Sequence, residues 1–175
     1  MSYLESDAVA TLGPEGTDSN EQALQLGCPV VLLGTYRAAI EYAKRHETKL
    51  LVPAGFRERY QEGFYSWVDF HFDNINYLEL VNVWFDKTLP MVFLHKSYKC
   101  IALHPSTIAL ISGLEHYEEI IYTQSKVEAY NLFEQGKVTA AIVSSRMIKK
   151  WTDQSCIKAR FAPTMVWCLY KVRNT

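Results

Sequence analysis

Short apolar runs alternate with amphipathic segments along most of the chain. Residues 8–12 and 30–33 are β-branched and apolar, as buried strands are. Residues 18–26 and 35–46 carry apolar side chains at helical spacing. This alternation predicts an α/β fold. Further strands are predicted at residues 50–52, 100–103, 120–122, 138–143, 157–161 and 166–172, and further helices at residues 105–114, 125–135 and 144–151.

The middle of the chain, residues 54–99, has a less regular pattern. Residues 57–62 are polar, which is typical of a loop or a short helix. Residues 64–72 alternate aromatic and polar positions and predict a strand. Long strands are predicted at residues 78–85 and 91–95, where they could cross between two lobes or add a partner subunit.

Three potential metal ligands, Asp69, His71 and Asp73, alternate along this stretch. In a strand they would share one face, and with His95 or His104 they would resemble a facial iron site. The solvent-facing side of an amphipathic strand explains the same pattern more simply. We therefore expect no metal site.

Polar residues that can cap helices follow several of the predicted strands. Helix starts present unpaired backbone N–H groups and the positive end of the helix dipole, which attract anions. Capping alone explains any single residue of this kind, but several such junctions in one small α/β protein predict a small-anion site. The cap candidates are Asp18, Thr35, Ser106, Ser125, and Ser144 or Ser145.

The composition excludes several classes of protein. The 175 residues are 49% hydrophobic and 21% charged, with a net charge of −1, whereas a general nucleic-acid binder carries a basic excess. No apolar run approaches the roughly 20 residues of a membrane span. Glu5 and Asp7 stand where a secretory signal would be basic and then apolar. We expect a soluble cytoplasmic protein that binds neither nucleic acid nor membrane.

The four cysteines do not form a metal or redox motif. Cys28, Cys100, Cys156 and Cys168 lie 72, 56 and 12 positions apart, without a close pair. Widely spaced cysteines of this kind are typical of ordinary buried thiols.

The near-neutral total hides an uneven distribution of charge. Residues 140–175 hold seven basic side chains against Asp153, a local charge of +6, so residues 1–139 carry −7. Arg146 or Arg160 could hold a carboxylate of a ligand. A solvated helix face explains the neighbouring lysines.

The most informative stretch runs from Gly13 to Ser19 and reads Gly-Pro-Glu-Gly-Thr-Asp-Ser. Glycines at positions 13 and 16 allow a tight turn and a close approach of backbone to ligand. Thr17 and Ser19 then offer hydroxyl groups at a helix start. This stretch resembles the N-terminal signature of prephenate dehydratases, Gly-Pro-x-Gly-Thr-x-Ser between a strand and a helix.

Three later segments extend the resemblance over most of the chain. Residues 103–105, Leu-His-Pro, resemble the Ser-His-Pro turn of that family, residues 125–129 its Ser-Thr-x-Glu-Ala helix start, and residues 140–144 its Ala-Ala-Ile-Ala-Ser segment. The resemblance implies a two-lobed fold like that of periplasmic binding proteins, with the substrate in the cleft and no regulatory domain.

Lobe boundaries follow from the same resemblance. We expect the first lobe to comprise about residues 1–85 and 160–175 and the second about residues 90–158.

Two departures from the dehydratase pattern bear on the reaction. Residues 52–56 read Val-Pro-Ala-Gly-Phe where dehydratases carry Pro-x-Glu-Asn-Ser. Residues 165–167 read Met-Val-Trp where dehydratases carry Thr-Arg-Phe, and Thr164 lies one position early. In that family the threonine helps to expel the ring hydroxyl and the arginine holds a carboxylate. The ending at residues 165–170 instead resembles that of the non-aromatising prephenate decarboxylases of bacilysin-type antibiotic biosynthesis.

The resemblance therefore implies a cofactor-free lyase that decarboxylates prephenate, a small dianion, without aromatising it. His104 is the candidate proton donor, although a histidine before proline is equally well a structural turn residue. The chain could also form a homodimer. The candidate substrate-binding residues are Gly16, Thr17, Ser19, Thr35, Ser125, Ser144, Arg160 and Thr164.

Two other functions remain open from the sequence. One is a non-catalytic protein of dehydratase-like fold that binds a small anion, since the polar positions of the family are partly lost. The other is a prephenate dehydratase that uses Thr164 after a shift of one residue.

Overall fold

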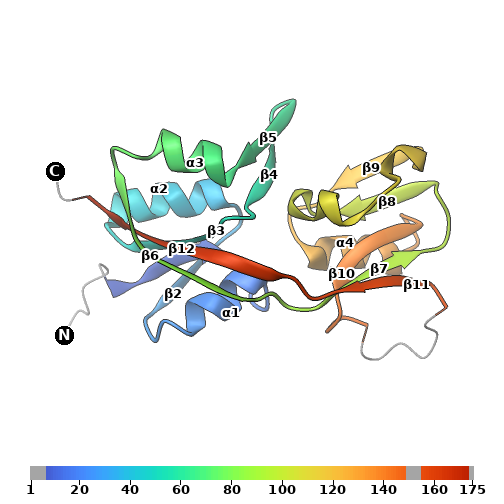
Figure 1. Cartoon of the computed structure of the whole chain (residues 1–175), viewed down its shortest axis with the longest axis horizontal. Helices are drawn as coiled ribbons and strands as arrows, with labels where there is room; N and C mark the ends of the chain where they lie inside the picture. The colour runs from blue at the N-terminus through green and yellow to red at the C-terminus, as the bar shows by residue number, and fades with distance from the viewer. Residues whose placement is uncertain (1–6, 149–154, 174–175) are drawn as a thin grey trace. The chain divides into compact units, whose positions relative to one another are not determined.

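The computed structural model describes residues 7–148 and 155–173. The chain forms two compact units (Figure 1). Unit 1 comprises residues 1–56, 65–87 and 164–175, and unit 2 comprises residues 57–64 and 88–163. The division predicted from the sequence differs most at residues 57–64, which group with unit 2 because their contacts lie there.

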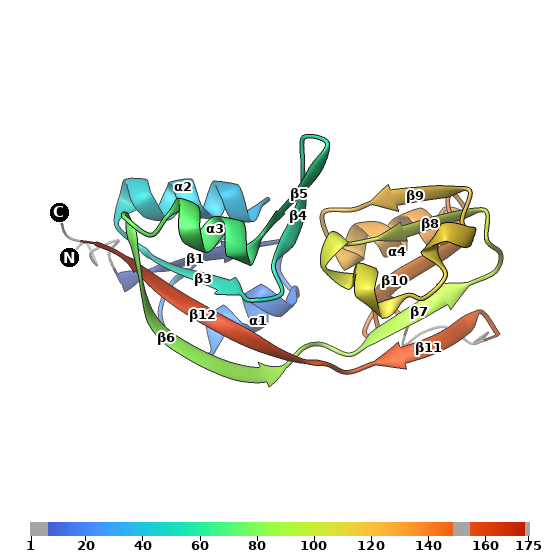
Figure 2. The same cartoon turned by 45° about the horizontal axis from the view of Figure 1, so that its top comes forward.

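Unit 1 is built on a five-stranded mixed sheet in the order β2-β1-β3-β12-β6. The first three strands are parallel, and β12 lies antiparallel to both β3 and β6, as Figure 2 shows for the long β6–β12 pair. The strands are β1 (Val9–Leu12), β2 (Val30–Leu33), β3 (Lys49–Pro53), β6 (Leu78–Lys87) and β12 (Thr164–Val172).

Helices cover both faces of this sheet (Figure 2). Successive residues of β1 point to opposite faces. Ala10 packs in the cluster that contains α2 (Tyr36–His46) and Phe70 of α3 (Trp67–Asp73), whereas Val9 packs with α1 (Asp18–Leu24). Unit 1 therefore has a core on each side of one sheet.

Helix α3 corrects the strand that was predicted at residues 64–72. Only β5 (Gly63–Ser66) is extended, and the chain turns helical at Trp67. Ser66 accepts from the backbone N–H of Asp69, and the Asp69 carboxylate accepts from the backbone N–H of Ser66, which is a reciprocal capping box. This cap and the burial of Phe70 outweigh the alternating pattern.

The metal hypothesis loses its geometric basis with that strand. On a helix, His71 lies two positions from both Asp69 and Asp73, so it no longer shares a face with them. Within residues 7–148 and 155–173, no three acidic, histidine or cysteine side chains gather as a metal site would need.

Unit 2 repeats the architecture, with a mixed sheet in the order β11-β7-β10-β8-β9. Strands β8, β9 and β10 are parallel, and β7 runs antiparallel to both β10 and β11. Helix α4 (Lys126–Glu134) covers one face. The strands are β7 (Met91–His95), β8 (Cys100–Leu103), β9 (Glu119–Tyr122), β10 (Ala140–Ser144) and β11 (Ile157–Phe161).

The other face of this sheet is covered by two short 3₁₀ segments, η2 (Pro105–Leu110) and η3 (Leu114–His116). They replace the α-helix predicted at residues 105–114, and His104 caps η2 where Ser106 was expected to cap a helix. Gly113, with φ of 82°, breaks the segment before an α-helix can extend. Of the helix predicted at residues 144–151, Ser144 is instead the end of β10, and residues 145–148 form turns.

A two-stranded hairpin joins the units in sequence. Its strands are β4 (Arg57–Tyr60) and β5, so the polar stretch at residues 57–62 is mainly strand, neither the loop nor the helix expected. Gln61 takes a left-handed conformation at the hairpin turn.

None of the helices in the described ranges is both long and apolar enough to cross a membrane.

Candidate functional site

In each sheet, the edge where the parallel strands end at their carboxyl ends is the part of the fold most suited to binding. In unit 1 the chain passes from β1 to β2 on one side and then to β3 on the other, so the strand order reverses between β1 and β3. In unit 2 the reversal lies between β8 and β10. Loops at the carboxyl ends of such strands are where open α/β sheets bind ligands.

At the edge of unit 1, the turn after β1 is held by its own backbone. The Gly13 N–H donates to the Leu33 carbonyl at 2.7 Å, which ties the turn to the end of β2. Gly16 has φ of 79°, and its N–H donates to Oδ1 of Asn20 at 2.9 Å. Its positive φ favours glycine here, as the sequence indicated.

Thr17, not Asp18, caps α1. Its hydroxyl oxygen accepts from the backbone N–H of Asn20 at 3.3 Å and donates to the Leu12 carbonyl at 3.1 Å. Thr35 caps α2 as expected and accepts from the N–H of Ala38 at 3.1 Å. Both hydroxyl groups therefore have local structural roles.

Ser19 is buried inside unit 1. Its hydroxyl group forms a short hydrogen bond with the Tyr36 hydroxyl, which links α1 to α2. This predicted binding residue therefore contacts the protein interior.

The two departures from the dehydratase pattern come together in space. The Ala54 N–H donates to the Val166 carbonyl at 2.8 Å. The Met165 thioether lies so close to Gly55 that a Cβ there would be 2.7 Å from Met165 Cε. Thr164 is exposed beside them and pairs with Lys87. The apolar side chain of Met165 thus packs against the turn that follows β3, although Met165 and Gly55 are about a hundred positions apart in sequence.

At the edge of unit 2, His104 closes the turn after β8. Its Nδ1 accepts from the Ser106 N–H at 3.2 Å and lies 2.7 Å from the Ser106 hydroxyl. Because Nδ1 accepts a hydrogen bond, the neutral ring carries its proton on Nε2. The imidazole is half-buried at the carboxyl end of β8.

Two serines predicted to bind substrate lie on the same edge. Ser125 caps α4, as expected, by accepting from the Glu128 N–H at 3.1 Å. Ser144 ends β10, is 7% exposed, and its hydroxyl oxygen has no hydrogen-bond partner within the described part of the chain. A buried hydroxyl without a partner is costly, so Ser144 is the one candidate here whose local structure does not account for it.

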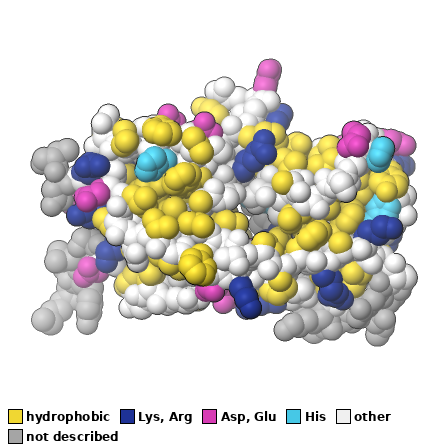
Figure 3. All heavy atoms as spheres, in the orientation of Figure 1, with side chains coloured by type: hydrophobic (Ala, Val, Ile, Leu, Met, Phe, Trp, Pro, Cys, Tyr) yellow, Lys and Arg dark blue, Asp and Glu magenta, His cyan; other side chains and the backbone are white. Residues whose placement is uncertain are grey.

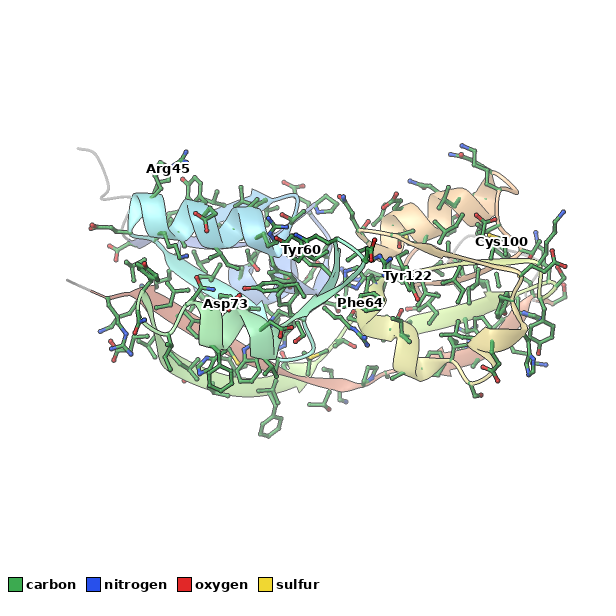
Figure 4. All side chains as sticks on the ribbon, turned by 90° about the horizontal axis from the view of Figure 1, so that it is seen from above. Arg45, Tyr60, Phe64, Asp73, Cys100 and Tyr122 are labelled. Carbon is green, nitrogen blue, oxygen red and sulfur yellow. The ribbon has the colours of Figure 1, made fainter. Side chains whose placement is uncertain are left out.

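Two arginines of unit 2, Arg57 and Arg59, were not among the binding residues predicted from the sequence. The Arg57 guanidinium lies 4.1 Å from the centre of the Phe64 ring, and the Arg59 guanidinium lies 5.3 Å from Phe64 and 5.7 Å from Tyr122. Figure 4 shows Phe64 beside Tyr122, and their rings meet edge to face at 5.2 Å.

This stacking places the arginines at the carboxyl edge of unit 2. Tyr122 is the last residue of β9, and β4 packs against η2, which follows β8. Within the described ranges, neither Arg57 nor Arg59 has a carboxylate within 4.0 Å. The aromatic rings hold the planar guanidinium groups without neutralising them.

Arg57 and Arg59 alternate along the sequence and Phe64 follows closely, which is a signal for a cationic surface next to an aromatic ring. The contact with Tyr122 has no such signal, because Tyr122 lies more than 60 positions away from both arginines. Arg160, by contrast, is exposed on β11, two strands away from β10. Arg146 is exposed in the turn after β10.

Two histidine–tyrosine clusters lie outside these edges, each with a buried tyrosine and a half-buried histidine. In unit 1 the Tyr170 hydroxyl accepts from Nε1 of Trp67 at 3.0 Å and lies 3.0 Å from Nδ1 of His71. In unit 2 Nδ1 of His95 lies 2.7 Å from the Tyr117 hydroxyl, at the amino end of β10.

Burial favours the neutral forms of Tyr170, Tyr117 and His95. It raises the pKa of Tyr170 above its ordinary value and the pKa of Tyr117 to about 12. Burial, with a smaller contribution from Lys158, lowers the pKa of His95. Such groups stabilise the fold as neutral hydrogen-bonding partners.

Comparison with known proteins relates this chain to others through structure alone. No protein-family profile and no curated protein sequence matches it. Among solved structures, the prephenate dehydratase of Arthrobacter aurescens in complex with L-Phe superposes with a TM-score of 0.58 at 15% identity. That match covers 96% of this chain and 61% of the dehydratase chain, so the protein spans less than two thirds of its length.

Two further structures widen the range of functions found with this fold. The VFT2 domain of Bordetella pertussis BvgS has a TM-score of 0.56 at 11% identity, covering 95% of this chain and 80% of the domain. GqqA, described as a novel type of quorum quenching acylase, has a TM-score of 0.51 at 14% identity, covering 96% and 65%. At such identities the likeness establishes the fold alone: that of the prephenate dehydratase catalytic domain and of periplasmic binding proteins.

Proposed function

We propose that this protein is a lyase that binds a small dianion of the prephenate type and decarboxylates it without forming an aromatic ring. The contact of Met165 with Gly55 carries the proposal. It brings together both segments in which dehydratases carry their polar motifs, and here neither segment supplies an acidic side chain. Asp86 pairs with Met165 on β6, but hydrogen bonds from Gln22 and from the Lys87 N–H lower its pKa, so its carboxylate is a poor proton donor to the ring hydroxyl.

The reaction follows from that loss. The bond between the ring carbon and its carboxylate breaks, and carbon dioxide leaves. The electron pair moves into the ring alkene, whose far carbon takes up a proton, and the hydroxyl group stays in place. His104, with its proton on Nε2 in the neutral ring, is the proposed donor, and solvent then returns the proton.

Recognition of the dianion is the proposed role of the arginine pair. Arg57 and Arg59 each offer a planar set of N–H donors that matches a carboxylate. Ser144 and the N-terminus of α4, capped by Ser125, add donors on the same edge of unit 2. These groups bind anions whether or not chemistry follows.

Incubation of the purified protein with prephenate tests the reaction. We expect release of carbon dioxide without growth of the phenylpyruvate absorbance band. Carbon dioxide together with phenylpyruvate would identify a dehydratase that uses Thr164, the exposed threonine at the start of β12. Either this outcome or no turnover at all contradicts the proposed reaction.

Substitution of the arginines tests the site. Arg59→Met should weaken prephenate binding roughly ten- to a hundredfold, since a hydrogen bond to a charged group contributes about 1.5–3 kcal/mol. Arg45→Met is the matched control, because Arg45 is an exposed arginine in the last turn of α2. Equal effects of the two changes on titration calorimetry would remove Arg59 from the site.

A binding protein without catalysis is the second candidate. The hydroxyl groups of Thr17, Thr35 and Ser125 all serve as helix caps, and His104 serves its own turn. These local roles leave few groups for acid–base work. Heat of binding with prephenate in the absence of any product would support this candidate over the lyase.

A further inference from the structure

Unit 1 exposes a large apolar patch on one face of its sheet. Figure 3 shows hydrophobic side chains gathered over α3, β6 and β12. Monomeric proteins rarely expose a continuous apolar surface of this size without a function for it. The patch consists of Val68, Phe72, Ile75, Tyr77, Leu80, Val83, Phe85 and Val166, each at least 37% exposed.

Strand pairing places its sheet residues on a common face. Phe85 pairs with Val166, and Val83 pairs with Cys168. The pairing is irregular between Leu169 and Tyr170, where β6 has one extra residue. Leu80 therefore pairs with Tyr170 and lies on the same face as Val83 and Phe85. Tyr170 is in turn covered by Phe70 of α3. The exposed side chains of α3 and of the two strands therefore border one another.

The area of the patch matches what a stable subunit interface needs. Phe85 is 77% exposed and Phe72 65% exposed. If a fully exposed aromatic side chain offers about 150–250 Å², the eight residues together offer on the order of 800 Å², which is what each partner buries in a standard interface. Interface centres are also rich in aromatic residues and poor in charge, as this patch is.

The edge of the sheet is less suited to association than its face. Side chains cover two backbone N–H groups of the outer strand, β6. The Val83 N–H donates to Oδ1 of Asn82 at 2.9 Å, and the Lys87 N–H donates to Oδ1 of Asp86 at 2.7 Å. Side-chain caps of this kind hinder the addition of another strand. The partner must therefore pack on the face.

Charges around the patch favour a copy of the same chain. Glu79 and Lys171 form an ion pair at 3.2 Å on the adjoining strands, and Asp73 and Lys87 lie at the ends of α3 and β6. A rim with both signs can face its own copy across a two-fold axis without opposing large fields of one sign.

We infer that this face of unit 1 binds a second copy of the chain and forms a homodimer by face-to-face packing of the apolar patch. The interface lies on the side of the sheet that carries α3, whereas α1 covers the opposite face. It is independent of the proposed reaction and requires no ligand.

Sedimentation of the 175-residue chain over about 1–100 µM tests the inference. The unaltered protein should sediment as a dimer at the upper end. Phe85→Glu should weaken dimerisation at least tenfold, because it removes the most exposed aromatic side chain and places a charge in an apolar interface. Phe72→Ser, on α3, should weaken dimerisation in the same direction.

Leu24→Glu is the matched control. Leu24 is 59% exposed on α1, and the substitution should leave the dimer intact. Far-ultraviolet circular dichroism verifies that each variant is folded. A monomer at the highest concentration, a dimer unaffected by both patch variants, or an equal loss in Leu24→Glu would each overturn the inference.

Discussion

Replacing Ser144 with alanine should make the unliganded protein more stable and its ligand binding weaker. Ser144 is 7% exposed at the end of β10, and its hydroxyl oxygen has no partner within the described residues. A buried polar group without a hydrogen bond costs about 1–3 kcal/mol. Alanine removes that cost and loses only the few packing contacts of the hydroxyl oxygen. The free energy of unfolding should therefore rise by about 1–2 kcal/mol.

The same hydroxyl group should matter when a ligand is bound. Ser144 lies on the same carboxyl edge of unit 2 as His104 and Ser125, and an anion bound there can accept a hydrogen bond from its hydroxyl group. Losing one hydrogen bond to a charged acceptor, about 1.5–3 kcal/mol, lowers the affinity roughly ten- to a hundredfold. Stability and binding thus change in opposite directions.

Two matched substitutions separate these effects in denaturant titrations and calorimetry. Thr48 is fully buried between α2 and β3, and its hydroxyl oxygen likewise has no partner within the described ranges. Thr48→Val should stabilise the protein but leave prephenate binding unchanged. Thr11 is equally buried but donates to the Leu51 carbonyl at 2.8 Å, so Thr11→Val should destabilise by about 1 kcal/mol.

The reasoning fails if Ser144→Ala destabilises the unliganded protein, because the hydroxyl group would then be satisfied in solution. It fails for function if Ser144→Ala and Thr48→Val change the affinity for prephenate equally.

Three further changes test other parts of the structure. Burial lowers the pKa of His95 from its ordinary 6.5, so on acidification the unfolded chain takes up a proton there before the folded protein does. The free energy of unfolding should therefore fall between about pH 7 and 5, and His95→Gln should flatten this fall in denaturant titrations. Tyr170→Phe should lower the free energy of unfolding by about 1–3 kcal/mol, because Nε1 of Trp67 loses its acceptor, and an unchanged denaturation midpoint would contradict that. Gly16→Ala should cost about 1–2 kcal/mol by thermal unfolding, since an alanine at φ of 79° is strained; the same change at Gly34, whose φ is not positive, serves as the control.

Local signals were sufficient for much of the fold. The caps at Thr35 and Ser125 were identified because a capping side chain reaches an N–H only three residues ahead. The alternation of strands and helices around them predicted the α/β class, which the structure and its structural relatives confirm.

The errors lie where a local pattern had two solutions. Residues 64–72 alternate as a strand does, yet Ser66 and Asp69 form a capping box and Phe70 finds a buried place on Tyr170. Alternation alone does not reveal which neighbours will cover a segment. The same applies to the hairpin that carries Arg57, read as loop or helix, whose contacts are with η2 and Tyr122.

The sequence by itself determined the rhythm of strands and helices, the glycine turn at residues 13–16 and the two places where the chain departs from the dehydratase pattern. Only the tertiary structure decided that Gly55 and Met165 touch, that Arg59 reaches Tyr122, and that the Ser144 hydroxyl is buried without a partner. Caps and turns depend on residues a few positions apart. The candidate site depends on contacts across strands, whose distance along the chain no local pattern encodes.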